Sequence, residues 1–123
     1  MVRVLVIEDD ETVRSMLLCL LADAGHEAIG ACDGCKGVAT YRQAPTDLVI
    51  TDIFMPEKDG LETIMELRRD FPDVKIIAVS GGGRSEATQY LHSAAEMGAE
   101  RTLSKPFTPL ELLSVVEEVL KAA

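Results

Sequence analysis

The sequence has few aromatic residues: three phenylalanines, two tyrosines and no tryptophan in 123 residues. A core must therefore be built from aliphatic side chains, which suits packed helices and sheet. No apolar run approaches the ~20 residues that a membrane-spanning helix needs, and the first residues, MVRVLVIEDD, turn acidic without a segment resembling a cleavage site. We therefore expect a cytoplasmic protein that does not enter a membrane.

Basic residues are also scarce. Lysine and arginine number 12 against 21 aspartates and glutamates, which gives a net charge of −9. This excess of negative charge repels a phosphate backbone and anionic lipids, so it argues against nucleic acid and membranes as partners. A cation or a basic protein surface fits better. The length suits one domain, and we expect residues 1–123 to form a single unit.

Only three cysteines are present, an odd number that argues against a disulfide framework. Cys32 and Cys35 form a C-x-x-C pair, which in an α/β chain can be a redox pair or half of a zinc site. Both histidines are isolated in the sequence, so no second pair completes a zinc site. The pair also precedes the second expected helix rather than the first. A structural role is therefore favoured, and Cys19 is expected on the core-facing side of its helix.

Short apolar runs alternate with longer amphipathic segments along the whole chain. This alternation predicts repeated βα units around a parallel sheet. The expected strands are residues 3–8, 27–32, 47–51, 74–80 and 100–104, and the expected helices are 12–24, 34–43, 60–70, 84–97 and 108–121. Five such units joined by right-handed crossovers give an open, doubly wound α/β sheet with helices on both faces, a three-layer sandwich.

Two of the expected helices have the clearest signals. In 12–24 the apolar residues recur at helical spacing, and Gly25 follows as a C-cap. That stripe consists of Val13, Met16, Leu17, Leu20, Leu21 and Ala24. In 108–121, Thr108 is the expected N-cap and Glu111 stands at the capping-box position.

Polar side chains gather where the expected strands end: Glu8, Asp9 and Asp10 after the first, Asp52 after the third, Ser80 at the fourth, and Lys105 with Pro106 after the fifth. Taken singly, each has a structural explanation, such as Asp10 capping the next helix. In an open α/β sheet, however, these strand ends meet at one edge. Carboxylates within a few Å of one another need a cation or protons, and hard oxygen ligands suit Mg²⁺. The joint pattern therefore predicts a divalent-metal site.

The motifs VIEDD, DIFMPEKDG, VS and SKPF, in this order, resemble the receiver domain of two-component response regulators over essentially the whole chain. The resemblance implies a flavodoxin-like five-stranded sheet of order 2-1-3-4-5. It also implies phosphoryl transfer to an aspartate from a histidine kinase or a histidine phosphotransfer protein. Such a protein is a signalling switch that catalyses only its own phosphorylation and dephosphorylation, and is not otherwise an enzyme.

By this resemblance Asp52 is the phosphoacceptor. A Mg²⁺ ion would be bound directly by Asp9, by Asp52 and by the backbone carbonyl of Phe54. Glu8 would act on the metal through a bound water. A carboxylate nucleophile needs no general base, so the chemistry reduces to positioning and to neutralising the charge of the transferred group.

The resemblance also identifies residues that bind the phosphoryl group. Ser80 would hydrogen-bond one phosphoryl oxygen and Lys105 would pair with another, and the bond between Lys105 and Pro106 would be cis. Thr102 stands where the family has an aromatic residue that rotates inward on activation. This departure puts the aromatic part of the switch in question here.

Two rival functions fit parts of the pattern. A haloacid-dehalogenase-like phosphatase also uses a strand-end aspartate and Mg²⁺, but it has a second aspartate two residues later, where this chain has Phe54. A degenerate receiver would serve as a phosphorylation-independent scaffold; the complete set of acidic, hydroxyl and lysine residues argues against it, and Thr102 leaves it open. We expect a stand-alone receiver that acts on a downstream target protein.

Overall fold

The structure is a computed structural model, and it describes residues 2–53, 60–81, 94–95 and 98–121. The elements within this range are β1 (Arg3–Ile7), α1 (Glu11–Asp23), β2 (Glu27–Ala31), α2 (Gly34–Gln43), β3 (Leu48–Asp52), α3 (Gly60–Asp70), β4 (Ile76–Gly81), β5 (Arg101–Lys105) and α5 (Pro109–Lys121). Each lies within one or two residues of its predicted bounds. The helix predicted over 84–97 falls almost wholly outside the described residues.

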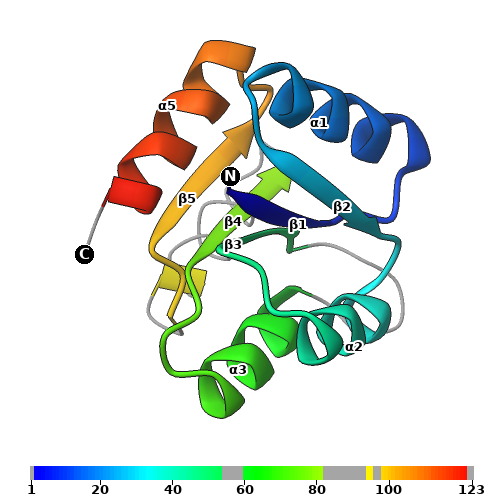
Figure 1. Ribbon diagram of the computed structural model, residues 1–123, viewed down its shortest axis with the longest axis vertical. Helices are drawn as coiled ribbons and strands as arrows, with labels where there is room; N and C mark the ends of the chain where they lie inside the picture. The colour runs from blue at the N-terminus through cyan, green and yellow to red at the C-terminus, as the bar shows by residue number, and fades with distance from the viewer. Residues whose placement is uncertain (1, 54–59, 82–93, 96–97, 122–123) are drawn as a thin grey trace.

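All five strands are parallel and follow the order β2-β1-β3-β4-β5 (Figure 1). Every residue of the central strand β3 is buried. The edge strands β2 and β5 are more exposed, because each has a sheet neighbour on one side only. The predicted doubly wound parallel sheet of order 2-1-3-4-5 is confirmed.

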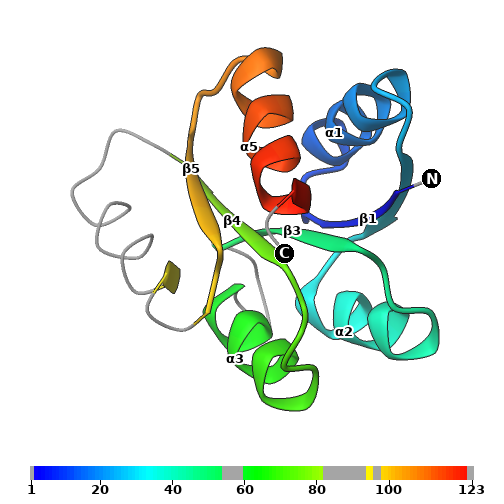
Figure 2. The same ribbon diagram turned by 60° about the vertical axis from the view of Figure 1, so that its left-hand side comes forward.

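Helices cover both faces of the sheet. α1 and α5 lie on one face, and α2 and α3 lie on the other (Figures 1 and 2). Each interface has its own aliphatic core: Leu17, Leu21, Leu112 and Val116 belong to the first, and Val38, Ile64 and Leu67 to the second. Full burial of one such side chain contributes about 1.5–3 kcal/mol. The predicted three-layer sandwich is therefore present in the described residues.

Capping residues fix where α1 and α5 begin and where α1 ends. Asp10 caps α1 by accepting a hydrogen bond from the backbone N–H of Val13 at 3.1 Å. Gly25 follows α1 with a φ of +92°, which a residue with a Cβ rarely adopts. At α5 the N–H of Glu111 donates to Oγ1 of Thr108 at 3.1 Å, as the capping box predicts. These caps fix the turns that follow β1 and β5.

One prediction for α1 is wrong. Cys19 is exposed rather than core-facing. It lies two residues after the buried Leu17, a rotation of about 200° around the helix axis, which places it on the solvent side. Met16 is 49% exposed and Leu18 packs partly against the core, so the stripe is centred nearer to Leu17 and Leu21 than predicted.

Among the described residues, none of the helices combines the length and the apolar character that a membrane crossing requires.

Candidate functional site

The strand register brings the predicted polar residues to one edge of the sheet. Ile7 pairs with Thr51, so Glu8 and Asp52, which come next along β1 and β3, stand at the same level. On the other side Ser80 pairs with Ser104, and Gly81 pairs with Lys105. The carboxyl ends of β1, β3, β4 and β5 therefore converge, as a parallel sheet requires.

Three carboxylates meet at this edge. Glu8, Asp9 and Asp52 each place one carboxylate oxygen within 4.8 Å of the other two. Glu8 is 2% exposed and Asp52 is 8% exposed, whereas Asp9 is exposed to solvent. Carboxylates this close repel one another unless a cation or a proton intervenes, and their hard oxygens match the preference of a divalent cation. We define these three residues as the acidic cluster.

Lys105 provides positive charge to this cluster. Its Nζ lies 2.8 Å from Oε1 of Glu8 and 3.3 Å from Oδ2 of Asp52. Burial opposes the charge on the lysine, but the hydrogen bond to Glu8 and the charges of Asp52 and Glu8 outweigh it, so the pKa of Lys105 is raised. The ammonium therefore stays protonated, and it bridges two carboxylates that belong to different strands.

Hydrogen bonds fix both the side chain and the backbone of Glu8. Its Oε1 accepts from Lys105 and its Oε2 accepts from the N–H of Asp10 at 3.2 Å. Its backbone N–H donates to the carbonyl of Ala31 at 3.0 Å. Asp9 differs: partial burial, followed by the hydrogen bond and the charge of Glu8, raises the pKa of Asp9. A bound cation would oppose this rise by favouring the ionised form.

The remaining predicted residues have definite positions, with one exception. Ser80 is fully buried at the end of β4. Thr102 is partly buried in β5 and pairs with Ala78. The Lys105–Pro106 peptide bond is cis, the isomer that the resemblance implies. Phe54, the predicted carbonyl ligand, lies outside the described residues.

Two residues at this edge were missed by sequence reasoning. Arg14 of α1 donates from Nη1 to the carbonyl of Glu8 at 2.8 Å. Gly60 opens α3 so close to β3 that an added Cβ would lie 2.2 Å from the backbone oxygen of Asp52. The Asp-Gly pair in the sequence indicates a turn but not this contact, because the contact depends on how α3 packs against β3.

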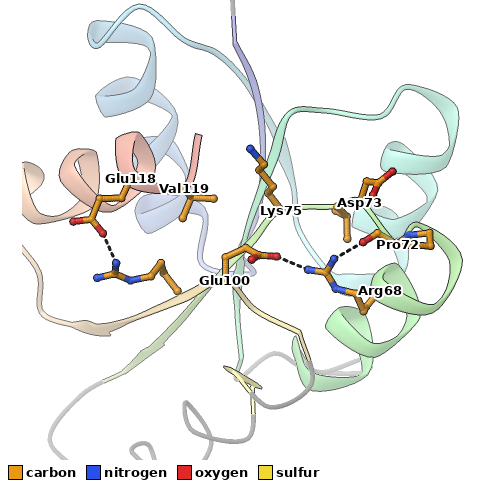
Figure 3. A pocket seen from close by; sticks show the side chains of 9 residues that line it. Arg68, Pro72, Asp73, Lys75, Glu100, Glu118 and Val119 are labelled. Carbon is orange, nitrogen blue, oxygen red and sulfur yellow. Dashed lines mark hydrogen bonds and ion pairs between the residues drawn. The ribbon is translucent and has the colours of Figure 1, made fainter. Parts of the chain in front are cut away.

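A cavity of about 430 Å³ lies at the opposite, amino end of β4 and β5 (Figure 3). Here each of two arginines faces its own carboxylate. Arg68 donates to Glu100 at 2.7 Å and to the carbonyl of Pro72 at 2.7 Å, and Arg101 pairs with Glu118. In each of these two pairs, one positive side chain is therefore neutralised by one negative side chain.

A family comparison agrees with the geometry of the acidic edge. Residues 4–117 match the response regulator receiver domain family. The chain belongs to this family. As a receiver, it is a phospho-accepting switch of two-component or phosphorelay signalling, and the acidic cluster suits Mg²⁺ binding and phosphorylation.

Individual relatives of this receiver cover nearly its whole length. It is 33% identical to the chemotaxis protein CheY of Thermotoga maritima over 97% of this chain and 98% of that protein. It is 32% identical to the probable transcriptional regulator ycf27 of Porphyridium aerugineum over 97% of this chain, but spans 48% of that protein. The receiver domain of NtrX from Brucella abortus superposes with a TM-score of 0.92 at 29% identity, covering 98% of this chain and 99% of that one.

Proposed function

We propose that Asp52 is the phosphoacceptor of this receiver. Its carboxylate stands at the end of a strand buried along its whole length, so its position is rigid. It shares the acidic cluster with Asp9 and Glu8, and it lies within 3.3 Å of the Lys105 ammonium. This convergence of one buried carboxylate, further acids and one lysine supports the assignment most strongly.

In the proposed reaction, a phosphohistidine of a histidine kinase or a phosphotransfer protein gives its phosphoryl group to an oxygen of Asp52. The N–P bond breaks, the electron pair stays on the histidine nitrogen, and an O–P bond forms. The charge of the group in transfer is spread over three oxygens. Lys105, already beside Asp52, would pair with one of them, and the Ser80 hydroxyl at the adjacent strand end would donate to another.

The acidic cluster would hold Mg²⁺ through Asp9 and Asp52. Both oxygens of Glu8 already accept hydrogen bonds from protein groups, which supports an indirect contact through water for that residue. The Phe54 carbonyl completes the proposed ligand set by resemblance. When bound, the ion supplies positive charge that neutralises the phosphoryl oxygens during transfer.

The switch would follow from the added charge. A phosphoryl group brings about −1.5 to −2 charges and three acceptor oxygens. Lys105 would then exchange a carboxylate partner for a phosphoryl oxygen, which releases part of its present contact with Glu8 and Asp52. Thr102, in place of an aromatic residue, would leave the hydroxyl and lysine movements to change the surface that a downstream target protein binds.

Residues 1–123 would form a single receiver domain, which the family match over residues 4–117 supports. The protein would lie in the cytoplasm and bind other proteins. The net charge of −9 supports the absence of a nucleic-acid partner. Apart from its own phosphorylation and dephosphorylation, it would catalyse no reaction.

The test is the intact mass of the protein after incubation with acetyl phosphate, with Mg²⁺ or with excess EDTA. The wild type should gain one phosphoryl group that requires Mg²⁺, and Asp52→Asn should gain none. Asp10→Asn is the matched control, because it removes a neighbouring acid while asparagine still caps α1. That variant should be phosphorylated like the wild type.

A folded wild type that gains no phosphoryl group, and whose spectrum does not respond to beryllofluoride, would support a phosphorylation-independent scaffold instead. Phosphorylation of Asp52→Asn to the wild-type level would remove Asp52 from the mechanism. Either result contradicts the proposal.

A further inference from the structure

Cys32 follows β2 at the carboxyl edge of the sheet, and its sulfur lies between two opposite charges. Nζ of Lys36 donates to its Sγ at 3.3 Å, and the Sγ donates to Oδ2 of Asp33 at 3.9 Å. Asp33 is already engaged, since its Oδ1 accepts from the N–H of Lys36 at 2.7 Å and thereby caps α2. The side chain of Cys32 is partly buried rather than enclosed.

This thiol lines a cavity of about 450 Å³ between α1 and α2, over the outer edge of β2. The described residues around it provide two cations, two neutral polar side chains and no carboxylate. They include Arg14, Cys32, Lys36, Thr40 and Gln43. A cavity of this volume admits a small molecule, and its cationic lining favours one with negative charge.

We propose that Cys32 is a modification site that forms a mixed disulfide with an anionic low-molecular-weight disulfide of the glutathione disulfide class. Cys32 loses its proton to solvent, and the thiolate attacks one sulfur of the reagent. The reagent's S–S bond breaks as the new one forms, and the second half leaves as a thiolate. The reagent is thereby reduced and Cys32 is oxidised, so no other oxidant is needed.

The charges around Cys32 favour this reaction. During disulfide exchange, negative charge is shared among the attacking, central and leaving sulfurs, and the Lys36 ammonium beside them stabilises it. Lys36 and Arg14 also attract the carboxylates of an anionic reagent. Asp33 acts in the opposite direction, because its carboxylate repels the developing charge. Reactivity should therefore fall when Lys36 is neutralised and rise when Asp33 is neutralised.

The chain supplies two control thiols. Cys19 and Cys35 are both exposed, more so than Cys32. Within the part of the chain that the structure describes, neither sulfur has a hydrogen bond to a cationic side chain. If exposure alone set the reaction rate, both would react faster than Cys32.

The first experiment compares three variants that each keep one cysteine, with the other two changed to serine. Each is reduced, freed of reductant, checked by circular dichroism and incubated with glutathione disulfide, and the adduct is followed by intact mass. The Cys32 protein should react roughly fivefold or more faster than either other variant, because one charge at this distance changes a rate by about that much. A rate equal to or below that of Cys19 or Cys35 would overturn the proposal.

A second experiment uses a rate ratio that does not depend on stability. In the protein that keeps only Cys32, the rate with anionic glutathione disulfide is divided by the rate with cationic cystamine. Lys36→Met should lower this ratio and Asp33→Asn should raise it, while asparagine preserves the cap of α2. Ratios that stay unchanged in both variants would contradict the assignment of Cys32.

Discussion

The two ends of the sheet contain similar charged side chains in different arrangements. At the amino end, Arg68 faces Glu100 and Arg101 faces Glu118 (Figure 3). All four side chains are at least a quarter exposed. At the carboxyl end, three carboxylates lie close together, and one lysine contacts two of them, Glu8 and Asp52, which are nearly buried. The first arrangement is balanced pair by pair, and the second has an excess of negative charge.

This difference separates a structural role from a functional one. Exposed, matched pairs contribute about 0–1 kcal/mol each and ask for no ligand. Buried carboxylates that outnumber their cations reduce stability until a cation joins them. A group of close carboxylates that lowers stability in the absence of a cation indicates a cation-binding site.

The largest effect should be on Mg²⁺ affinity. Asp9→Asn removes one exposed carboxylate of the acidic cluster, and we expect affinity for Mg²⁺ to fall roughly tenfold or more, as for the loss of other groups that support a metal site. Asp73→Asn, at the amino-end cavity, has the same change in charge and should leave affinity unchanged. Calorimetric titration with Mg²⁺ measures both. Equal losses in the two variants would show that net charge alone sets the affinity.

The next effect concerns stability. Lys105→Met leaves the buried Glu8 and Asp52 without their cation, and should lower the free energy of unfolding by about 2 kcal/mol, less than for a fully buried pair because Lys105 is partly exposed. Arg101→Met breaks an exposed pair and should cost less than about 0.5 kcal/mol. Urea denaturation measures both. Added Mg²⁺ should reduce the loss of unfolding free energy in Lys105→Met. Similar losses of unfolding free energy in both variants would contradict the difference between the two ends of the sheet.

Much of this fold could be predicted from the sequence, because local rules determine it. The bounds of α2 and α3 match the predicted 34–43 and 60–70, and the Thr108 capping box forms as expected. The prediction that Cys19 faces the core was wrong. Which side of α1 faces the sheet depends on how the whole helix packs, and the spacing of apolar residues alone does not fix this at Cys19.

A third prediction concerns two glycines, Gly60 at the carboxyl end of the sheet and Gly98 at its amino end. Gly60→Ala would drive a Cβ into the backbone of Asp52, and such overpacking costs about 1–3 kcal/mol. At the amino end, Gly98→Ala would strain a φ of +127° and meet the side chain of Arg68. Both variants should be destabilised, but only Gly60→Ala should accept phosphate from acetyl phosphate more slowly. Normal phosphorylation of folded Gly60→Ala would show that the position of Asp52 tolerates this shift.

The smallest effect should arise at Asp70, a carboxylate that forms surface ion pairs with two arginines. Arg69 and then Arg42 hold the pKa of Asp70 well below its usual range. A lowered pKa in the folded state adds stability above the ordinary pKa of about 4, and this stability is lost as pH falls below it. The wild type should therefore melt slightly above Asp70→Asn at pH 7, with the gap closing below about pH 4. A difference in melting temperature that increased as the pH fell would contradict this prediction.

The candidate site could be predicted only in part. Strand ends in the sequence located Glu8, Asp9, Asp52, Ser80 and Lys105. The bridge from Lys105 to Glu8 was not predicted, because β5 and β1 are separated in the sheet by β4 and β3 and the contact joins residues 97 apart. Its existence depends on the reach of a lysine side chain across strands, which spacing along the chain does not show.

The most direct test of the central claim is the location of the phosphoryl group. After phosphorylation by acetyl phosphate with Mg²⁺, the acyl phosphate is reduced with borohydride, which converts the modified aspartate to homoserine, and the position is read by tandem mass spectrometry. Homoserine at position 52 is the predicted result. Homoserine at Asp9 or at any other aspartate, with Asp52 unmodified, would contradict the account.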